Sequence, residues 1–166
     1  MKKAIGFVLL LVAVLVQVTW APRIAVAGVF PNLALVLVIA ITWGVGVEAG
    51  MAWACVAGLM LDLTAPGPLG PHAVALLAGA YITGFWSRNL SRQSLVHPAL
   101  ASAASTILYS LVLIGSDLAL RLPLPPLLIA VQLIVTAALY NAALMPFAVL
   151  VVRRIHAPLA RAPEPA

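Results

Sequence analysis

The chain has 166 residues, of which 64% are hydrophobic and 8% are charged. A water-soluble domain is typically about 45–50% apolar and about 25% charged, so this composition excludes a soluble globule, a disordered chain and a disulfide scaffold. The single cysteine, Cys55, excludes an internal disulfide and a cysteine-based metal cluster. The net charge of +5 comes from only nine Lys and Arg residues at the ends of apolar runs. That pattern is typical of membrane topology, and we expect no nucleic-acid partner.

The apolar runs predict an all-α, polytopic integral membrane protein. A hydrocarbon core about 30 Å thick needs roughly 20 residues of helix to cross it. Six runs are predicted to cross: residues 4–20, a second run that begins at Ile24 or Pro31 and ends at Trp43-Gly44, and then residues 47–63, 71–86, 95–118 and 127–152. Their apolar character is continuous, whereas a membrane strand would alternate. We therefore expect a six-helix transmembrane domain over residues 1–152 and a short cytoplasmic tail over residues 153–166.

Proline and glycine mark the breaks between these runs. Pro22 ends the first run, because proline cannot continue the hydrogen-bond ladder of a helix. Residues 66–70, with the sequence PGPLG, predict a turn between the third and fourth helices, and residues 122–126, LPLPP, predict a rigid hairpin before the sixth. Pro146 lies inside the sixth run, where we expect a kink.

The positive charges predict the orientation of the six helices. With six spans, Arg23 and Arg121 fall on one side of the membrane. The other side carries Lys2, Lys3, Arg88, Arg92, Arg153, Arg154 and Arg161. Because Lys and Arg are in excess on the cytoplasmic side, both termini are expected to be cytoplasmic. Tryptophan at three span ends agrees with this topology, because its ring favours the membrane interface.

An alternative concerns the N-terminus, where two lysines, an apolar run and Ala25-Val26-Ala27 are also typical of a cleavable signal peptide. Cleavage would leave five spans. The run is longer than the apolar region of a typical signal peptide, and Pro22 and Arg23 separate it from the cleavage-like triplet. We therefore favour six spans.

Small residues line one face of the third run. Gly46, Gly50, Ala54 and Gly58 follow at steps of four, and Asp62 continues the face. Small side chains let helices approach closely in lipid. Two interpretations remain open: a groove for a partner helix, or ordinary packing inside the bundle. We also expect the third helix to be the central one. Weaker stripes occur on the fourth and fifth runs, at Ala75, Gly79 and Thr83 and at Ala99, Ser102, Ala103, Thr106 and Ser110.

Reactive groups are scarce within the spans. The acids lie near span ends or in the tail, and the three histidines are far apart in sequence. We find no metal-ligand spacing, no phosphate-binding loop and no nucleophile elbow, so we expect no catalytic residue, cofactor or metal. Polar residues expected to be buried on the sixth helix, where they would hydrogen-bond across helices or line a cavity, are Gln132, Thr136, Tyr140 and Asn141.

Asp62 is the one acid for which the sequence predicts a specific contact. It is followed by a short turn rich in proline and glycine, and a helix begins after that turn. The first N–H groups of a helix have no intrahelical acceptor and carry a partial positive charge. Asp62 is therefore predicted to bind the start of the fourth helix. The alternative is an acid solvated among the lipid headgroups.

The order of three short motifs resembles the MreD family. These are Pro31-Asn32-Leu33, then Gly58-Leu59-Met60-Leu61-Asp62-Leu63, and then Leu69-Gly70. The insert Pro66-Gly67-Pro68 departs from the family in detail. The resemblance implies a six-helix fold similar to the substrate-binding subunits of energy-coupling-factor vitamin transporters. It also implies that a partner-binding or structural motif is formed by Pro31, Asn32, Gly50, Gly58, Asp62 and Gly70.

The resemblance further implies a function without catalysis. MreD proteins are inner-membrane components of the bacterial cell-elongation machinery, which sets rod shape and directs peptidoglycan synthesis. They bind MreC, a protein with one membrane span, and work with MreB, RodA and its partner transpeptidase. We expect a lipid-facing groove of small residues to accept the MreC helix, and the cytoplasmic arginines to contact anionic lipid or acidic partners.

Two other classes of function were weighed. A substrate-binding subunit of a vitamin-type transporter would need convergent polar groups and aromatic walls. Gln132, Tyr140 and Asn141 could supply polar groups, but aromatic residues make up only 7% of the chain. A lipid-processing enzyme is the weakest reading, because there is no acid cluster to hold a metal.

Overall fold

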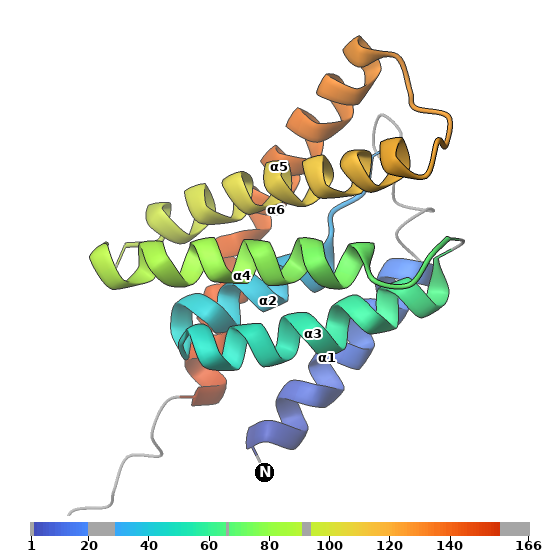
Figure 1. The fold of residues 1–166 in the computed structure, drawn as a ribbon. Helices are drawn as coiled ribbons and strands as arrows, with labels where there is room; N and C mark the ends of the chain where they lie inside the picture. The colour runs from blue at the N-terminus through green and yellow to red at the C-terminus, as the bar shows by residue number, and fades with distance from the viewer. Residues whose placement is uncertain (1, 20–28, 66, 91–93, 157–166) are drawn as a thin grey trace, which may run out of the picture.

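The computed structural model describes residues 2–19, 29–65, 67–90 and 94–156. These residues form six α-helices, which confirms the all-α expectation (Figure 1). Their bounds are α1 Lys2–Thr19, α2 Leu33–Gly44, α3 Val47–Thr64, α4 Pro71–Asn89, α5 Val96–Ala119 and α6 Leu127–His156. Ile24, the triplet at 25–27, Pro22, Arg23, Pro66, Arg92 and Arg161 lie outside the described residues.

The helix ends follow the proline and glycine signals closely. α2 begins at Leu33, two residues after Pro31, with Asn32 as its N-cap. α4 begins at Pro71, the first helical position, where the missing N–H of proline leaves no bond unmade. α6 continues four residues past the predicted end at Val152, through Arg153 and Arg154. Pro146 lies inside α6.

Three of the helices are long and apolar enough to cross a membrane, namely α3, α5 and α6. α2 has 12 residues and so spans only about 18 Å, less than a bilayer core. The lengths and compositions of α3, α5 and α6 therefore support a membrane protein. α2 is too short to cross a bilayer core by itself, so other helices must surround it.

The central helix of the bundle is α2, and the expectation that the third helix is central is wrong. Nine of the 12 residues of α2 are buried, and α2 contacts each of the other five helices. α3 packs chiefly on α4 and α2. A helix that is apolar on all sides, as α2 is, is expected in a protein interior. Its short length lets the longer helices enclose it.

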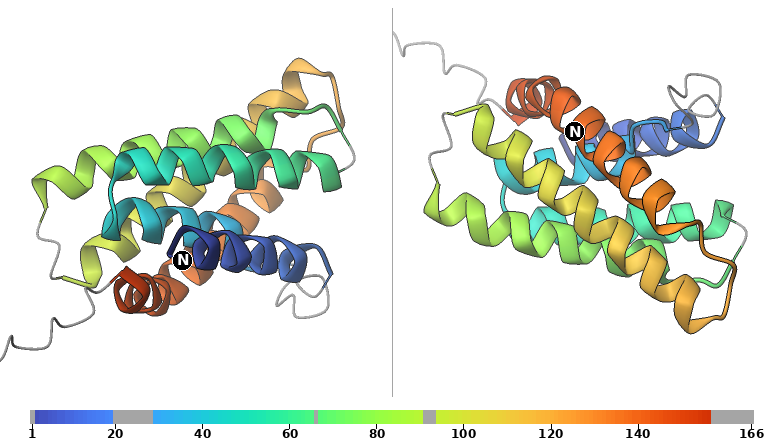
Figure 2. Two further views of the ribbon diagram at one scale, coloured as in Figure 1. Left: turned by 90° about the horizontal axis from the view of Figure 1, so that it is seen from below. Right: turned by 90° about the horizontal axis from the view of Figure 1, so that it is seen from above.

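Around α2, the helices α3, α4 and α5 lie side by side and α6 crosses them obliquely (Figures 1 and 2). α6 has 30 residues and is about 45 Å long. Its first half projects away from the other helices (Figure 1), and Leu127 and Leu128 are each 81% exposed. Hydrocarbon is the natural surrounding for such a surface, because soluble proteins rarely expose large apolar patches.

The small-residue stripe of α3 is filled from inside the bundle. Gly50 lies against Thr42 of α2, and Gly58 lies against Ala73 of α4. A Cβ atom at Gly58 would be 2.7 Å from the Ala73 nitrogen and 2.9 Å from the Ala73 Cβ, so no side chain fits there. Packing within the bundle is therefore the correct interpretation for the buried part of this stripe, Gly50, Ala54, Gly58 and Asp62, where α2 and α4 leave no room for a partner helix. Gly46 lies outside α3 as its N-cap, and no atom lies within 4 Å of its Cβ position.

The weaker stripe on α4 faces inward, because Ala75, Gly79 and Thr83 are buried. The stripe on α5 does so only in part: Ser102 and Thr106 are buried, whereas Ala99, Ala103 and Ser110 are partly exposed. Thr83 of α4 and Ser105 of α5 form a hydrogen bond of 3.1 Å between their hydroxyl groups. The small residues thus bring α3, α4 and α5 close together around α2.

Candidate functional site

Five of the six motif residues, Pro31, Asn32, Gly58, Asp62 and Gly70, meet at one end of the bundle, which we call the polar end. Gly50 lies away from it, against Thr42 near the opposite end of α2. It is formed by the N-terminus of α2, the C-terminus of α3 and the N-terminus of α4, together with the parts of α5 and α6 that pack on them. Four hydrogen-bonded contacts build this end, and each one joins two or three helices.

The first contact joins α3 to α4 through Asp62. One carboxylate oxygen, Oδ1, accepts a hydrogen bond from the backbone N–H of His72 at 2.9 Å, and Oδ2 accepts one from Ala73 at 3.2 Å. Proline occupies the position before them, so these are the N–H groups of the first turn of α4 that need an external acceptor. Asp62 is only 3% exposed. The predicted contact is therefore present, and the alternative of a solvated acid is wrong.

Gly58 explains how Asp62 reaches α4. It lies one turn before Asp62 on the same face of α3, directly against Ala73, whose N–H bonds to Asp62. Any side chain at residue 58 would push α4 away and lengthen that hydrogen bond. In the spacing Gly-x-x-x-Asp, Gly58 thus lets α4 approach α3 closely, and Asp62 caps the N-terminus of α4.

The turn between α3 and α4 uses glycine where other residues would be strained. Gly70 is the N-cap of α4 and has φ of 121°, and Gly67 has φ of 153°. Side chains disfavour these conformations, because Cβ would clash with the backbone. Glycine at position 70 of the motif is therefore explained by the backbone conformation. It is not explained by lack of space, because no atom lies within 4 Å of where its Cβ would be.

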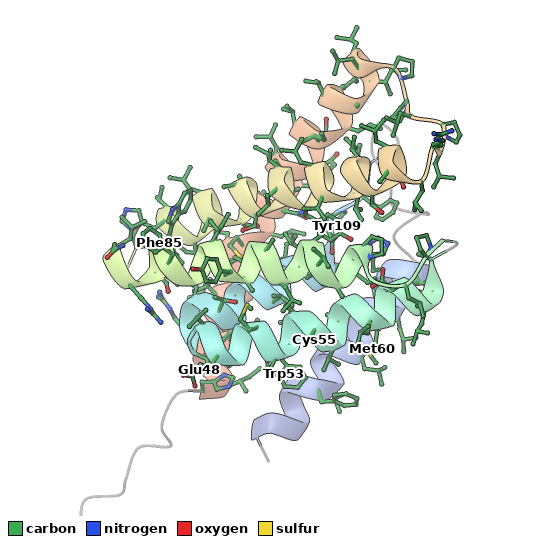
Figure 3. All side chains as sticks on the ribbon, in the orientation of Figure 1. Glu48, Trp53, Cys55, Met60, Phe85 and Tyr109 are labelled. Carbon is green, nitrogen blue, oxygen red and sulfur yellow. The ribbon has the colours of Figure 1, made fainter. Side chains whose placement is uncertain are left out.

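The second contact joins α4 to α5 through side chains. The Nδ1 atom of His72 and the hydroxyl group of Tyr109 form a hydrogen bond of 2.5 Å. Tyr109 is 8% exposed and lies between α4 and α5 (Figure 3). The sequence analysis missed Tyr109. Its signal was available, because Tyr109 follows Ser102 and Thr106 at helical spacing and so belongs to the buried face of α5.

The third contact joins α2, α6 and α5 through two asparagines. Asn32 caps its own helix by accepting from Leu35 N–H at 2.9 Å, and its backbone N–H donates to Oδ1 of Asn141 at 2.8 Å. The Nδ2 group of Asn141 donates to the hydroxyl group of Thr106 at 2.9 Å. Thr106 and Tyr109 lie on the same buried face of α5, so this contact adjoins the hydrogen bond between His72 and Tyr109. We call these neighbouring residues the polar network: Asn32, Asp62, His72, Thr106, Tyr109 and Asn141.

The fourth contact joins α1 to α2. The Oε1 atom of Gln17 accepts a hydrogen bond from Ala34 N–H at 3.1 Å. Together with Asn32 and Asn141, it gives the N-terminus of α2 three amide side chains as partners. The start of α2 is half-buried, and these side chains supply the acceptors that its first N–H groups lack within the helix. Pro31 precedes the N-cap and therefore lies outside the helix.

Of the four residues of α6 predicted to be buried, only Asn141 is. Gln132 is exposed, and Thr136 and Tyr140 are partly exposed. The Thr136 hydroxyl group bonds to the backbone oxygen of Gln132, within its own helix. The prediction is wrong for these three residues, because the first half of α6 projects from the bundle.

Two hollows open beside the polar network. The smaller, of about 160 Å³, is lined by Asp62, Ala65, Gly67, Pro68, Pro71, His72, Leu113, Ser116 and Asp117. The larger, of about 330 Å³, is lined by Val29, Phe30, Ser110, Leu113, Ile114, Asp117, Pro125, Ala130, Leu133, Ile134 and Ala137. Within the described residues, no group of three or more His, Cys, Asp or Glu side chains is arranged to hold a metal ion.

Comparison with known proteins identifies the family. The sequence model of the rod shape-determining protein MreD family matches residues 1–117 of the chain. The chain belongs to the MreD family. It is therefore a rod-shape-determining membrane protein of a family not known as an enzyme family. The resemblance inferred from the three short motifs is thus confirmed. No curated protein and no solved structure matches the chain.

The match to the MreD family includes α1 to α4 and nearly all of α5. Pro31, Asn32, Gly50, Gly58, Asp62 and Gly70 all lie within it. Asn141 lies on α6, outside the matched region, yet it completes the hydrogen bonding of Asn32. The polar network therefore links the MreD-like part of the chain to its last helix.

Proposed function

We propose that this MreD protein is a non-enzymatic scaffold of the cell-elongation machinery and binds MreC within the bacterial inner membrane. The observation that carries the proposal is the polar network itself. It satisfies backbone N–H groups at the starts of α2 and α4 and joins α2, α3, α4, α5 and α6, while Gln17 joins α1 to α2. Contacts of this kind between helices are typical of a rigid support.

The proposal includes six membrane spans with both termini in the cytoplasm. α4, α5 and α6 alternate in direction, so that Arg88 near the end of α4 lies at the same end of the bundle as Arg153 and Arg154. α1 also begins at that end, with its two lysines in the first turn. An excess of Arg and Lys supports a cytoplasmic location for this end, where anionic lipid is the simplest partner for the arginines. The polar end then faces the periplasm.

In this proposal the motif residues act structurally. Asn32, Asp62 and Gly70 shape the polar end, and Gly50 and Gly58 set the distances between helices. Pro31 places the chain for the start of α2. The partner surface must then lie on a face that these helices leave exposed, because Gly50 and Gly58 already lie against α2 and α4.

Co-purification tests the proposal. The chain and MreC are co-expressed, extracted in a mild detergent and captured through a tag on the chain, with an unrelated single-span protein as the control. We expect retention of MreC and no retention of the control. Equal recovery of the two would refute binding of MreC. Reporter fusions at the two termini test the topology, and opposite locations would refute six spans.

A substrate-binding subunit of a vitamin-type transporter is the competing proposal, since the six-helix fold is expected to be similar in both. The hollow that carries Asp62 and His72 measures about 160 Å³. Pockets for small molecules typically measure about 300–1,000 Å³. The adjoining hollow measures about 330 Å³, which is within that range, but Ser110 and Asp117 are the only polar residues among the described residues that line it. It therefore lacks the convergent polar groups of a small-molecule site. The lining favours the scaffold, and tight binding of a vitamin in calorimetry would reverse this conclusion.

A further inference from the structure

The two hollows beside the polar network adjoin each other along α5. Leu113 and Asp117 line both of them. The smaller hollow lies toward α3 and α4, and the larger is a wedge between α5 and the first half of α6. Together they form one cleft at the polar end, which we call the α5–α6 cleft.

The wall that α6 contributes to this cleft is apolar and has small residues at regular intervals. Ala130 and Ala137 are two helical turns apart on α6, with Leu133 and Ile134 between them. Small side chains at this spacing allow another helix to approach closely in lipid. Ala130, Ile134 and Ala137 are partly exposed and Leu133 is exposed, so this wall is accessible to a partner.

Asp117 is the one charged group on the α5 wall. The hydrogen bonds of this end use Asp62, His72 and Tyr109, and none of those between described residues involves the Asp117 carboxylate. His72 is the one basic side chain among the described residues that line the two hollows, and it interacts with the charge of Asp117. No described Lys or Arg lines either hollow. The cleft therefore combines an apolar wall with a partly exposed carboxylate near the end of α5, and this carboxylate is complementary to a basic side chain of a partner.

We propose that the α5–α6 cleft docks the membrane-spanning helix of a partner and that this helix places a Lys or Arg side chain against Asp117. The inference rests on the proposed function, and it identifies the face on which the single-span partner binds. A phospholipid fits the cleft less well, because its phosphate group would meet the carboxylates of both Asp117 and Asp62. A basic side chain brings only the complementary charge.

Substitution of Asp117 tests the charge contact. Wild type, Asp117→Asn and Glu48→Gln are compared for retention of co-expressed MreC in mild detergent. Glu48 is the matched control, because it is exposed and lies at the opposite end of α3 from the polar network (Figure 3). We expect Asp117→Asn to weaken retention about tenfold, the scale of a close charge pair at an interface, and Glu48→Gln to leave it unchanged. Unchanged thermal stability of Asp117→Asn excludes misfolding as the cause.

Photo-crosslinking tests the location independently. A photoreactive residue replaces Leu133 in the cleft or, as the control, Tyr81 of α4, which is 65% exposed. We expect a crosslink to MreC from position 133 and none from position 81. Crosslinks to lipid alone at 133, or full retention by Asp117→Asn, would overturn this inference while leaving the proposed function intact. Failure of the wild type to retain MreC would overturn both.

Discussion

Removal of the Asp62 carboxylate is the most direct test of how the polar end is held together. Asp62→Ala leaves the N–H groups of His72 and Ala73 without acceptors, at a position where the native side chain is only 3% exposed. Hydrogen bonds to a charged group contribute about 1.5–3 kcal/mol each. The loss of two such bonds predicts a fall of about 3–5 kcal/mol in the free energy of unfolding.

Asp62→Asn separates acceptor geometry from charge. The amide keeps one oxygen that can accept a hydrogen bond, but its NH₂ group then faces a second donor. We expect a loss of about 1–3 kcal/mol, between the wild type and Asp62→Ala. Charge alone would make the two variants equal, so their order reports on the hydrogen bonds.

Unfolding of the purified protein in detergent measures these differences. The fraction that remains monodisperse in size-exclusion chromatography is followed against temperature, and equilibrium unfolding in a denaturing detergent supplies the free energies. Glu48→Ala serves as the control, because Glu48 is exposed and no hydrogen bond is expected to be lost. If Asp62→Ala and Asp62→Asn both unfold with the wild type, then Asp62 does not hold α3 to α4.

Four further substitutions and one control test the helix packing and the polar network. Gly58→Leu and Gly50→Leu should prevent accumulation of folded protein, because backbone or buried atoms occupy the space that the new side chain needs. Gly115→Leu is the control and should be tolerated, since nothing lies within 4 Å of its Cβ position. Normal expression of Gly58→Leu and Gly50→Leu would contradict the observed packing. Asn141→Leu leaves the backbone N–H of Asn32 without its acceptor, so the free energy of unfolding should fall by about 1–3 kcal/mol in the same assay. A stability equal to that of the wild type would mean that the Asn32 N–H does not need this acceptor. Tyr109→Phe removes only the hydrogen bond to His72, so the free energy of unfolding should fall by about 1 kcal/mol, seen as a small fall in the melting temperature. A loss of stability as large as that of Asp62→Ala would mean that Tyr109 contributes as much to the network as Asp62.

The sequence by itself was sufficient for the properties that depend on composition and on near neighbours. Continuous apolar runs identified the membrane class, and proline and glycine located most of the helix ends. The contact of Asp62 was also predictable, because only a short turn separates this carboxylate from the N–H groups that it binds. The three short motifs indicated the MreD family, which the family comparison then confirmed.

Only the tertiary structure decided which helix is central and which polar residues meet. α2 lies at the centre because the other five helices, all of them longer, enclose it. The sequence of α2 does not determine how those helices cross it. Asn32 and Asn141 are 109 residues apart in the sequence, so no local pattern predicts their hydrogen bond. The exposure of Gln132 follows from the direction of α6, which departs from the bundle. A residue's burial is set by neighbours distant in the chain, whereas a helix and its ends are set largely by neighbours within one or two turns.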